Sequence, residues 1–201
     1  MSPRSPWSQQ LTILVLLLVL TFYDITPCSA IEPTPQSVLL EAVRNDDPTA
    51  IERAILTLGA DMDLQGGGGQ TPLVHAVLSG KQQAVETLLK LGANVDIPEK
   101  DGYTVAHAAG FQGRAEILKV LAAHQDKAID IMQPHTDGYY PLHRACWGRE
   151  QRHTDTVQAF LDLGVPPNLP AANGKDCLTM TNNPATRSLI QAALAKTSTE
   201  L

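Results

Sequence analysis

Aromatic residues, cysteines and long runs of like charge are all scarce in this chain. Of its 201 residues only 4% are aromatic and three are cysteines. Three cysteines exclude the dense disulfide framework that holds many small secreted domains together. The formal net charge is −6, so the basic face required for nucleic-acid binding is missing. The chain is nevertheless long enough to bury an apolar core of its own.

Sequence motifs that carry catalysis are also missing. The run Gly66–Gly69 is followed by Gln70 and Thr71, without the lysine that a phosphate-binding P-loop places there. Neither G-x-S-x-G nor H-E-x-x-H occurs, which excludes the commonest signatures of serine hydrolases and zinc proteases. The acids Asp61, Asp63 and Asp96 lie in turn-like segments, where Asp bonds to its own backbone. We therefore expect no enzyme activity, no catalytic residues, no cofactor and no bound metal.

The first 30 residues differ from the rest of the chain. A short polar segment with Arg4 precedes an apolar run over residues 11–23, and small residues follow up to Ala30. This order is typical of a secretory signal peptide, so we expect cleavage after Ala30 and a secreted or periplasmic protein. A bilayer span needs about 20 apolar residues, and this run has 13. The alternative is a retained signal anchor that tethers the protein to a membrane.

A short pattern recurs through the remainder of the chain. "GQTPLVHAV" from Gly69, "GYTVAHAAG" from Gly102 and "GYYPLHRAC" from Gly138 share it, and "GKDCLTMTN" from Gly174 is a weaker copy. The copies follow one another at 33, 36 and 36 residues. A second pattern alternates with the first, as "LGADMD" from Leu58, "LGANVD" from Leu91 and "LGVPPN" from Leu163. A fixed period of this length is the mark of a repeat protein.

The repeated unit resembles the ankyrin repeat, whose signature is T-P-L-H-x-A in about 33 residues. The resemblance implies an all-α solenoid of about five helix-turn-helix units, the first and last incomplete, with short β-hairpin-like fingers. It covers residues 37–196, between a linker over 31–36 and a tail over 197–201. The four glycines then lie at the tip of the first finger, which we expect to be mobile. The segment "WGREQRHTDT" from Trp147 reads as a longer loop within the fourth unit.

Local physical chemistry supports this interpretation. Thr followed by Pro is a good helix start, because the hydroxyl caps free N–H groups and proline needs no donor there. The second helix of each unit shows helical apolar spacing, at Ile51, Ala54, Ile55, Leu58, Val85, Leu88, Leu89, Ile117, Val120, Leu121, Val157, Phe160 and Leu161. A glycine follows three of these helices, at Gly59, Gly92 and Gly164, as a left-handed helix end requires.

Two histidines occupy the histidine position of the signature. In the family this imidazole bonds to the backbone of neighbouring turns, so the resemblance implies a structural role for His107 and His143. Another hypothesis is a metal or redox site built from His143, Cys146 and Cys177, since imidazole and thiolate are zinc and copper ligands. The two cysteines are alternatively core residues, or a single disulfide if their Cα atoms lie within about 7 Å.

The resemblance implies that the protein is a non-catalytic module that binds another protein. The family's variable contact positions are the fingers and the exposed end of each first helix. The residues that we assign to this contact face are Leu78, Lys100, Tyr103, Phe111, Tyr139, Trp147 and Arg149. They include four of the six aromatic residues after position 30, and outward-facing rings mark binding hot spots. Alternatively, Phe111 and Trp147 seal the stack.

Basic residues near the same end bear on the choice of partner. Lys100, Arg149, Arg152 and His153 either surround the aromatic residues and favour an acidic partner, or form a solvated edge. We expect a monomer that binds no nucleic acid and meets a membrane only if the N-terminal segment is retained.

Overall fold

Proline marks the start of half of the helices. The computed structural model describes residues 32–124 and 129–199. Five of its helices start at a proline: α2 (Pro35–Arg44), α3 (Pro48–Leu56), α4 (Pro72–Ser79), α8 (Pro141–Cys146) and α11 (Pro184–Thr199). The others are α5 (Gln82–Lys90), α6 (Val105–Gln112), α7 (Ala115–Ala122), α9 (Gln151–Asp162), α10 (Cys177–Met180) and the short 3-10 turn η1 (Gly67–Gly69). Proline suits the first helical position because an N–H there has no acceptor within the helix.

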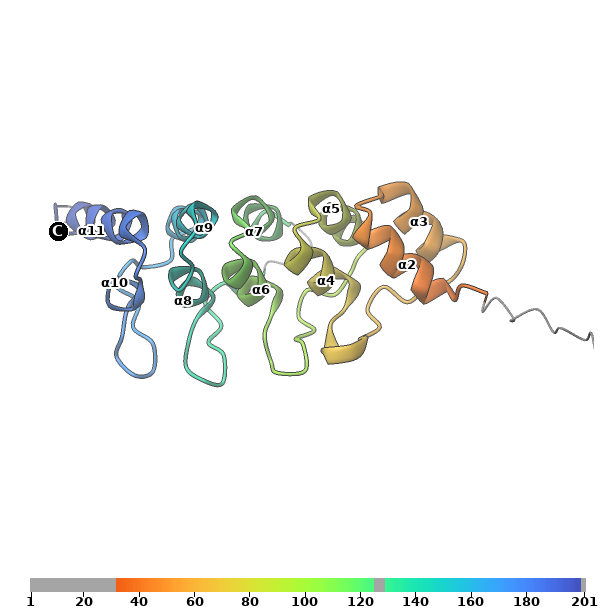
Figure 1. Ribbon diagram of the computed structural model, residues 1–201, viewed down its shortest axis with the longest axis horizontal. Coiled ribbons are helices and arrows are strands. Elements are labelled where there is room, and N and C mark those ends of the chain that lie inside the picture. Colours follow the sequence, from red (N-terminus) through yellow and green to blue (C-terminus); the bar gives the residue numbers. More distant parts are fainter. Residues whose placement is uncertain (1–31, 125–128, 200–201) are drawn as a thin grey trace, which may run out of the picture. The chain divides into compact units, whose positions relative to one another are not determined.

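The helices of the unit formed by residues 35–201 lie in two rows. The first helices of successive pairs, α2, α4, α6, α8 and α10, make one row, and the second helices, α3, α5, α7, α9 and α11, make the other (Figure 1). Along each row a helix packs on its neighbours, so that α6 contacts α4 and α8, and α7 contacts α5 and α9. No strand occurs in the described residues. This linear stack confirms the predicted all-α solenoid.

Side-chain caps explain where several helices begin. The Asp47 carboxylate accepts from the Ala50 N–H at 3.0 Å, and the Thr71 hydroxyl accepts from the Val74 N–H at 3.3 Å. Asp176 accepts from the Thr179 N–H at 2.8 Å and starts α10. Each of these bonds satisfies an N–H that the helix itself leaves free. The predicted start at Thr71 is therefore confirmed.

The core follows the apolar spacing of the second helices, with one exception. Of the 13 positions that the spacing assigned to the helix faces, nine are buried and Ile55, Val120 and Leu161 are half-buried. Leu58 is exposed because α3 ends at Leu56, two residues earlier. The assignment of Leu58 to the core was wrong. The predicted left-handed helix ends are confirmed, because Gly59, Gly92 and Gly164 all have positive φ just after their helices.

Four fingers project from the stack between helix pairs (Figure 1). Each is closed by the same bond, in which the N–H of one residue donates to the carbonyl four residues later: Gly66 to Gln70, Glu99 to Tyr103, His135 to Tyr139 and Ala171 to Lys175, all at 2.8–2.9 Å. Bonds also connect neighbouring fingers, from Lys100 N to Gly68 O at 3.1 Å and from Ala172 N to Gly138 O at 3.0 Å. The fingers are thus hairpin-like turns held to one another.

The glycine run has a role in packing that its sequence did not indicate. Gly69 has φ of 75°, and a Cβ atom there would lie 2.4 Å from the Lys100 backbone nitrogen. The Gln65 side-chain amide donates to the carbonyls of Gly69 and Pro98, both at 2.8 Å. These contacts hold the first finger against the second, so at least Gly69 is required for close approach rather than as a spacer.

Several boundaries differ from the expected ones. Helix α2 starts within the predicted linker over 31–36, and α11 extends to Thr199, into the predicted tail. Most of the segment expected as a long loop after Trp147 is helical, since α9 starts at Gln151. The predicted signal peptide over residues 1–30 lies outside the described residues. No helix in the described part of the chain is long and apolar enough to cross a membrane.

Replacement of Gly110 by alanine is expected to destabilise the stack, although alanine is the better helix former. A Cβ atom at Gly110, inside α6, would lie 2.4 Å from the Pro141 carbonyl oxygen at the start of α8. Backbone cannot move aside as a flexible side chain does, so we expect a loss of about 2 kcal/mol in the free energy of unfolding. Urea denaturation measures it. Gly67→Ala is the matched control, because a Cβ atom there meets nothing within 4 Å; an equally small effect at Gly110 would contradict the prediction.

Candidate interaction groove

Four of the seven residues assigned to the contact face line a single groove. This cavity has a volume of about 400 Å³ and lies along the first helices α4, α6 and α8 and the second finger. The four predicted residues in its lining are Leu78, Tyr103, Phe111 and Trp147, and the other lining residues are Gln70, Glu99, Asp101, His107, Ala108, Gln112 and Arg144. Its size falls in the range typical of binding clefts.

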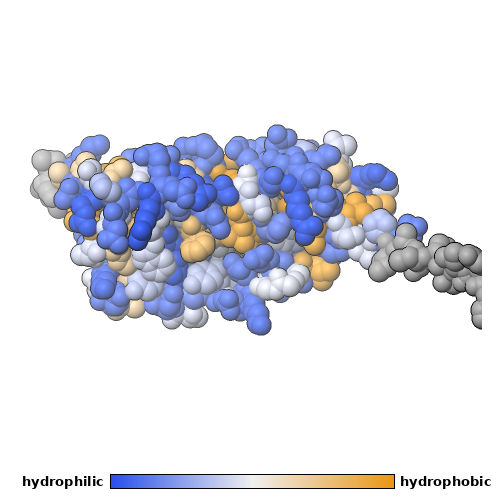
Figure 2. All heavy atoms as spheres, in the orientation of Figure 1, coloured by the Kyte–Doolittle hydropathy of each residue, from blue (hydrophilic) through white to orange (hydrophobic). Residues whose placement is uncertain are grey.

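Two of these aromatic side chains reach solvent. Phe111, in the last turn of α6, is 60% exposed, and Trp147, immediately after α8, is 41% exposed. Both rings thus keep part of their surface open to solvent, although Trp147 also packs against Tyr139. Hydrophilic residues cover most of the face in Figure 2, and apolar residues reach the surface only in places. Exposed rings beside a groove are consistent with a binding role.

Arg144 is the central polar residue of the groove and is not among the predicted contact residues. Its side chain is only 4% exposed, and its guanidinium carbon lies 4.7 Å from the Trp147 ring centroid and 4.8 Å from that of Tyr103. Nη2 donates to both Asp137 carboxylate oxygens, at 2.8 and 2.6 Å, whereas the buried Nε has no partner. Contact with aromatic faces and a carboxylate suits a guanidinium that is largely removed from water.

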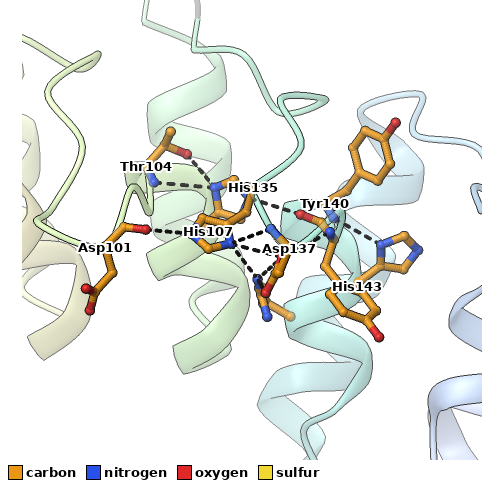
Figure 3. Close-up of polar contacts among 9 residues, drawn as sticks. Asp101, Thr104, His107, His135, Asp137, Tyr140 and His143 are labelled. Carbon is orange, nitrogen blue, oxygen red and sulfur yellow. Dashed lines mark hydrogen bonds and ion pairs between the residues drawn. The ribbon is translucent and has the colours of Figure 1, made fainter. Parts of the chain in front are cut away.

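His135 connects this ion pair to the second finger. Its Nε2 donates to the Asp101 carbonyl oxygen at 2.6 Å, and its Nδ1 lies 2.9 Å from Asp137 Oδ1 (Figure 3). The imidazole also stacks on the Tyr103 ring, with centroids 4.1 Å apart. Burial opposes ionisation of Asp137, but hydrogen bonds from the Arg144 guanidinium and the Tyr139 backbone N–H outweigh it and help to hold the Asp137 pKa at about 2. The carboxylate is therefore charged at neutral pH and neutralises Arg144.

The two signature histidines act as backbone braces. His107 Nε2 donates to the Tyr139 carbonyl at 3.4 Å, and its Nδ1 lies 2.9 Å from the Thr104 hydroxyl (Figure 3). His143 Nε2 donates to the Leu169 carbonyl at 3.0 Å and its Nδ1 accepts from the Tyr140 N–H at 3.1 Å. Each ring joins its helix to the next repeat, which confirms their predicted structural role. Burial lowers the pKa of His107 to about 4, although its bond to Tyr139 acts to raise it.

Three predicted contact residues do not line the groove. Lys100 and Arg149 are exposed, and Tyr139 instead packs edge-on to Trp147, with centroids 5.0 Å apart. The four basic residues expected to favour an acidic partner are also absent from the lining of the groove. Arg152 pairs with Glu150 at 2.9 Å, and His153 is buried with Nε2 donating to the Phe111 carbonyl at 3.2 Å.

The cysteines and His143 have structural partners. Cys146, the last residue of α8, and Cys177, the first of α10, form a disulfide with Cα atoms 5.5 Å apart. Both sulfurs and both His143 ring nitrogens are thus engaged within the protein. Among the described residues no group of three His, Cys, Asp or Glu side chains is placed to hold a metal ion. Of the three alternatives for the cysteines, a metal or redox site, two core residues or a disulfide, the structure shows the disulfide.

Comparisons with known proteins agree with the repeat architecture. A family model for ankyrin repeats in three copies matches residues 39–133, and a model for a single ankyrin repeat matches residues 137–172. The chain is 34% identical to the E3 ubiquitin-protein ligase KEG of Arabidopsis thaliana over 149 residues, which are 72% of this chain and 9% of the ligase. It is 38% identical to the chicken (Gallus gallus) nuclear factor NF-kappa-B p105 subunit over 74 residues, 37% of this chain and 8% of that protein.

A shorter relative is matched along most of its length. The human Notch-regulated ankyrin repeat-containing protein is 29% identical over 101 residues, which are 49% of this chain and 87% of that protein. The fold and the groove define a stacked helix-turn-helix repeat protein with an aromatic-lined cleft. The two family models between them match most of the chain, which belongs to the ankyrin-repeat family.

Proposed function

We propose that this chain is a non-catalytic protein-binding module that acts outside the cytoplasm. The groove along α4, α6 and α8, with exposed Phe111 and Trp147 at its rim, is the observation that carries the proposal. Ankyrin repeats mediate protein–protein interaction in general, and one of the relatives is by name a subunit of a nuclear factor. The partner of this chain is then another protein, which places apolar side chains against these two rings.

The extracytoplasmic location is supported by two independent features. The order of charge, apolar run and small residues over residues 1–30 is typical of a signal peptide. The Cys146–Cys177 disulfide is typical of an oxidising compartment. N-terminal sequencing of the protein recovered from cells tests the location, since we expect Ile31 as the first residue. An intact N-terminus in the membrane fraction would instead indicate a tethered scaffold.

Replacement of Trp147 by alanine is expected to weaken partner binding by about tenfold or more, because a half-exposed aromatic ring at a groove loses its contact area with the partner. The partner is identified first by chemical cross-linking to the wild-type protein, and its affinity for each variant is then measured by titration calorimetry. Leu56→Ala is the matched control, because Leu56 is 71% exposed on α3 and lies outside the groove. The proposal fails if Trp147→Ala and Leu56→Ala bind the partner as the wild type does.

A further inference from the structure

The groove carries an excess of negative charge, because its one arginine is already paired within the protein. Glu99, Asp101 and Arg144 are the charged residues among those that line it. The Arg144 guanidinium is nearly buried and already paired with Asp137. In the described part of the chain neither Glu99 nor Asp101 forms an ion pair; Glu99 Oε2 accepts only from the neutral Gln70 amide, at 3.3 Å. The groove therefore offers two uncompensated carboxylates to a ligand.

The apolar part of the groove also suits a positively charged ligand. Trp147 already holds one cation against its ring, since Arg144 lies 4.7 Å from the centroid. Phe111 is the most exposed ring of the groove. Aromatic faces attract cations, and carboxylates at the edge of an apolar cleft attract them more strongly than in open water. An acidic side chain entering the same cleft would be repelled by Glu99 and Asp101.

From this charge complementarity we infer that the groove binds a lysine or arginine side chain of the protein partner. The inference rests on the proposed function and specifies the chemistry of its contact. The aliphatic stem of the partner residue lies along Phe111 and Leu78, and its charged end lies near Glu99 and Asp101. The cavity of about 400 Å³ has room for one such side chain and part of its backbone. Lys100 and Arg149 do not line the cavity and so do not occupy this position.

Capped amino acids test the inference directly. The purified full chain, labelled with ¹⁵N, is titrated with N-acetyl-arginine methylamide while the Trp147 indole N–H signal is followed by NMR; the signal is assigned from a Trp147→Phe variant. The matched ligands are the citrulline derivative, which has the shape of arginine without its charge, and the glutamate derivative. We expect arginine to bind about threefold or more tightly than citrulline and glutamate not to bind.

Variants identify the groups responsible. Glu99→Gln combined with Asp101→Asn is expected to weaken arginine binding by about threefold or more. Glu86→Gln combined with Asp155→Asn changes net charge equally at exposed sites outside the groove and is expected to have no effect. Equal binding of arginine and citrulline, or an unshifted Trp147 signal, would overturn the inference. If the proposed function fails, Trp147→Ala binds the partner as tightly as the wild type does. If only this inference fails, Trp147→Ala still weakens partner binding, but the Glu99→Gln/Asp101→Asn variant binds the partner normally.

Discussion

Reduction of the Cys146–Cys177 disulfide is expected to lower the free energy of unfolding by about 4 kcal/mol. The bridge closes a loop with a sequence separation of 31 residues, and a loop of this length restricts the unfolded chain by roughly that amount. The effect is expected to concentrate at the C-terminal end of the stack. Helix α10 has only four residues, too few to be stable alone, and the bridge attaches it to α8.

Urea denaturation with and without dithiothreitol measures this loss, and hydrogen exchange over residues 177–199 locates it. A variant with alanine at both Cys146 and Cys177 is the control: it is expected to match the reduced wild type and to be insensitive to the reductant. Cys28, which the structure does not describe, is unchanged in that variant, so any remaining response to reductant would come from it. Identical unfolding midpoints in oxidised and reduced protein would show that the bridge adds no stability.

Mild acid is expected to destabilise the stack through its buried histidines. The pKa of His107 is about 4 in the folded protein, against an ordinary value of 6.5. Between these pH values the unfolded chain binds a proton at this site and the folded chain does not, so the free energy of unfolding falls as pH decreases. The contribution of neutral His107 to the free energy of unfolding is fully present above pH 6.5. About 3 kcal/mol of this contribution is lost by pH 4. Burial lowers the pKa of His143 too, which adds to the loss in the same direction.

Urea denaturation at several pH values between 7 and 4 measures this dependence. His107→Asn removes the titrating ring, so its slope of stability against pH is expected to be smaller than that of the wild type, whatever stability it loses at pH 7. A combination with His143→Asn is expected to flatten the curve further. An unchanged slope in His107→Asn would mean that protonation of His107 does not limit stability in acid.

The repeat architecture could be read from the sequence because its determinants are local. The Thr71 hydroxyl caps α4 by accepting from an N–H only three residues away, and Gly92 ends a helix through its own φ angle. Such effects depend on neighbours along the chain, and the 33- and 36-residue spacing repeats them. The error at Leu58 has the same origin, since apolar periodicity continued past the end of α3 at Leu56.

The groove was predictable only in part. Leu78, Tyr103, Phe111 and Trp147 were found from their positions in the repeat. Arg144, His135, Glu99 and Asp101 were missed, although an arginine within the apolar helix "PLHRAC" was a signal that could have pointed to a buried ion pair. The acidic-partner hypothesis was drawn from basic residues expected near the same end of the repeats, and the structure pairs or buries two of them, Arg152 and His153.

The sequence by itself determined the start of α4, the turn glycines and the order of the repeats, because each depends on a few consecutive residues. Only the tertiary structure decided which charges cancel and which remain available to a partner. Asp137 meets Arg144 and His135, while Asp101, equivalent in its finger, keeps its carboxylate unpaired among the described residues. That difference arises because the fold brings the Arg144 guanidinium within 2.6 Å of Asp137, seven residues away, whereas the corresponding position after Asp101 holds the uncharged Ala108.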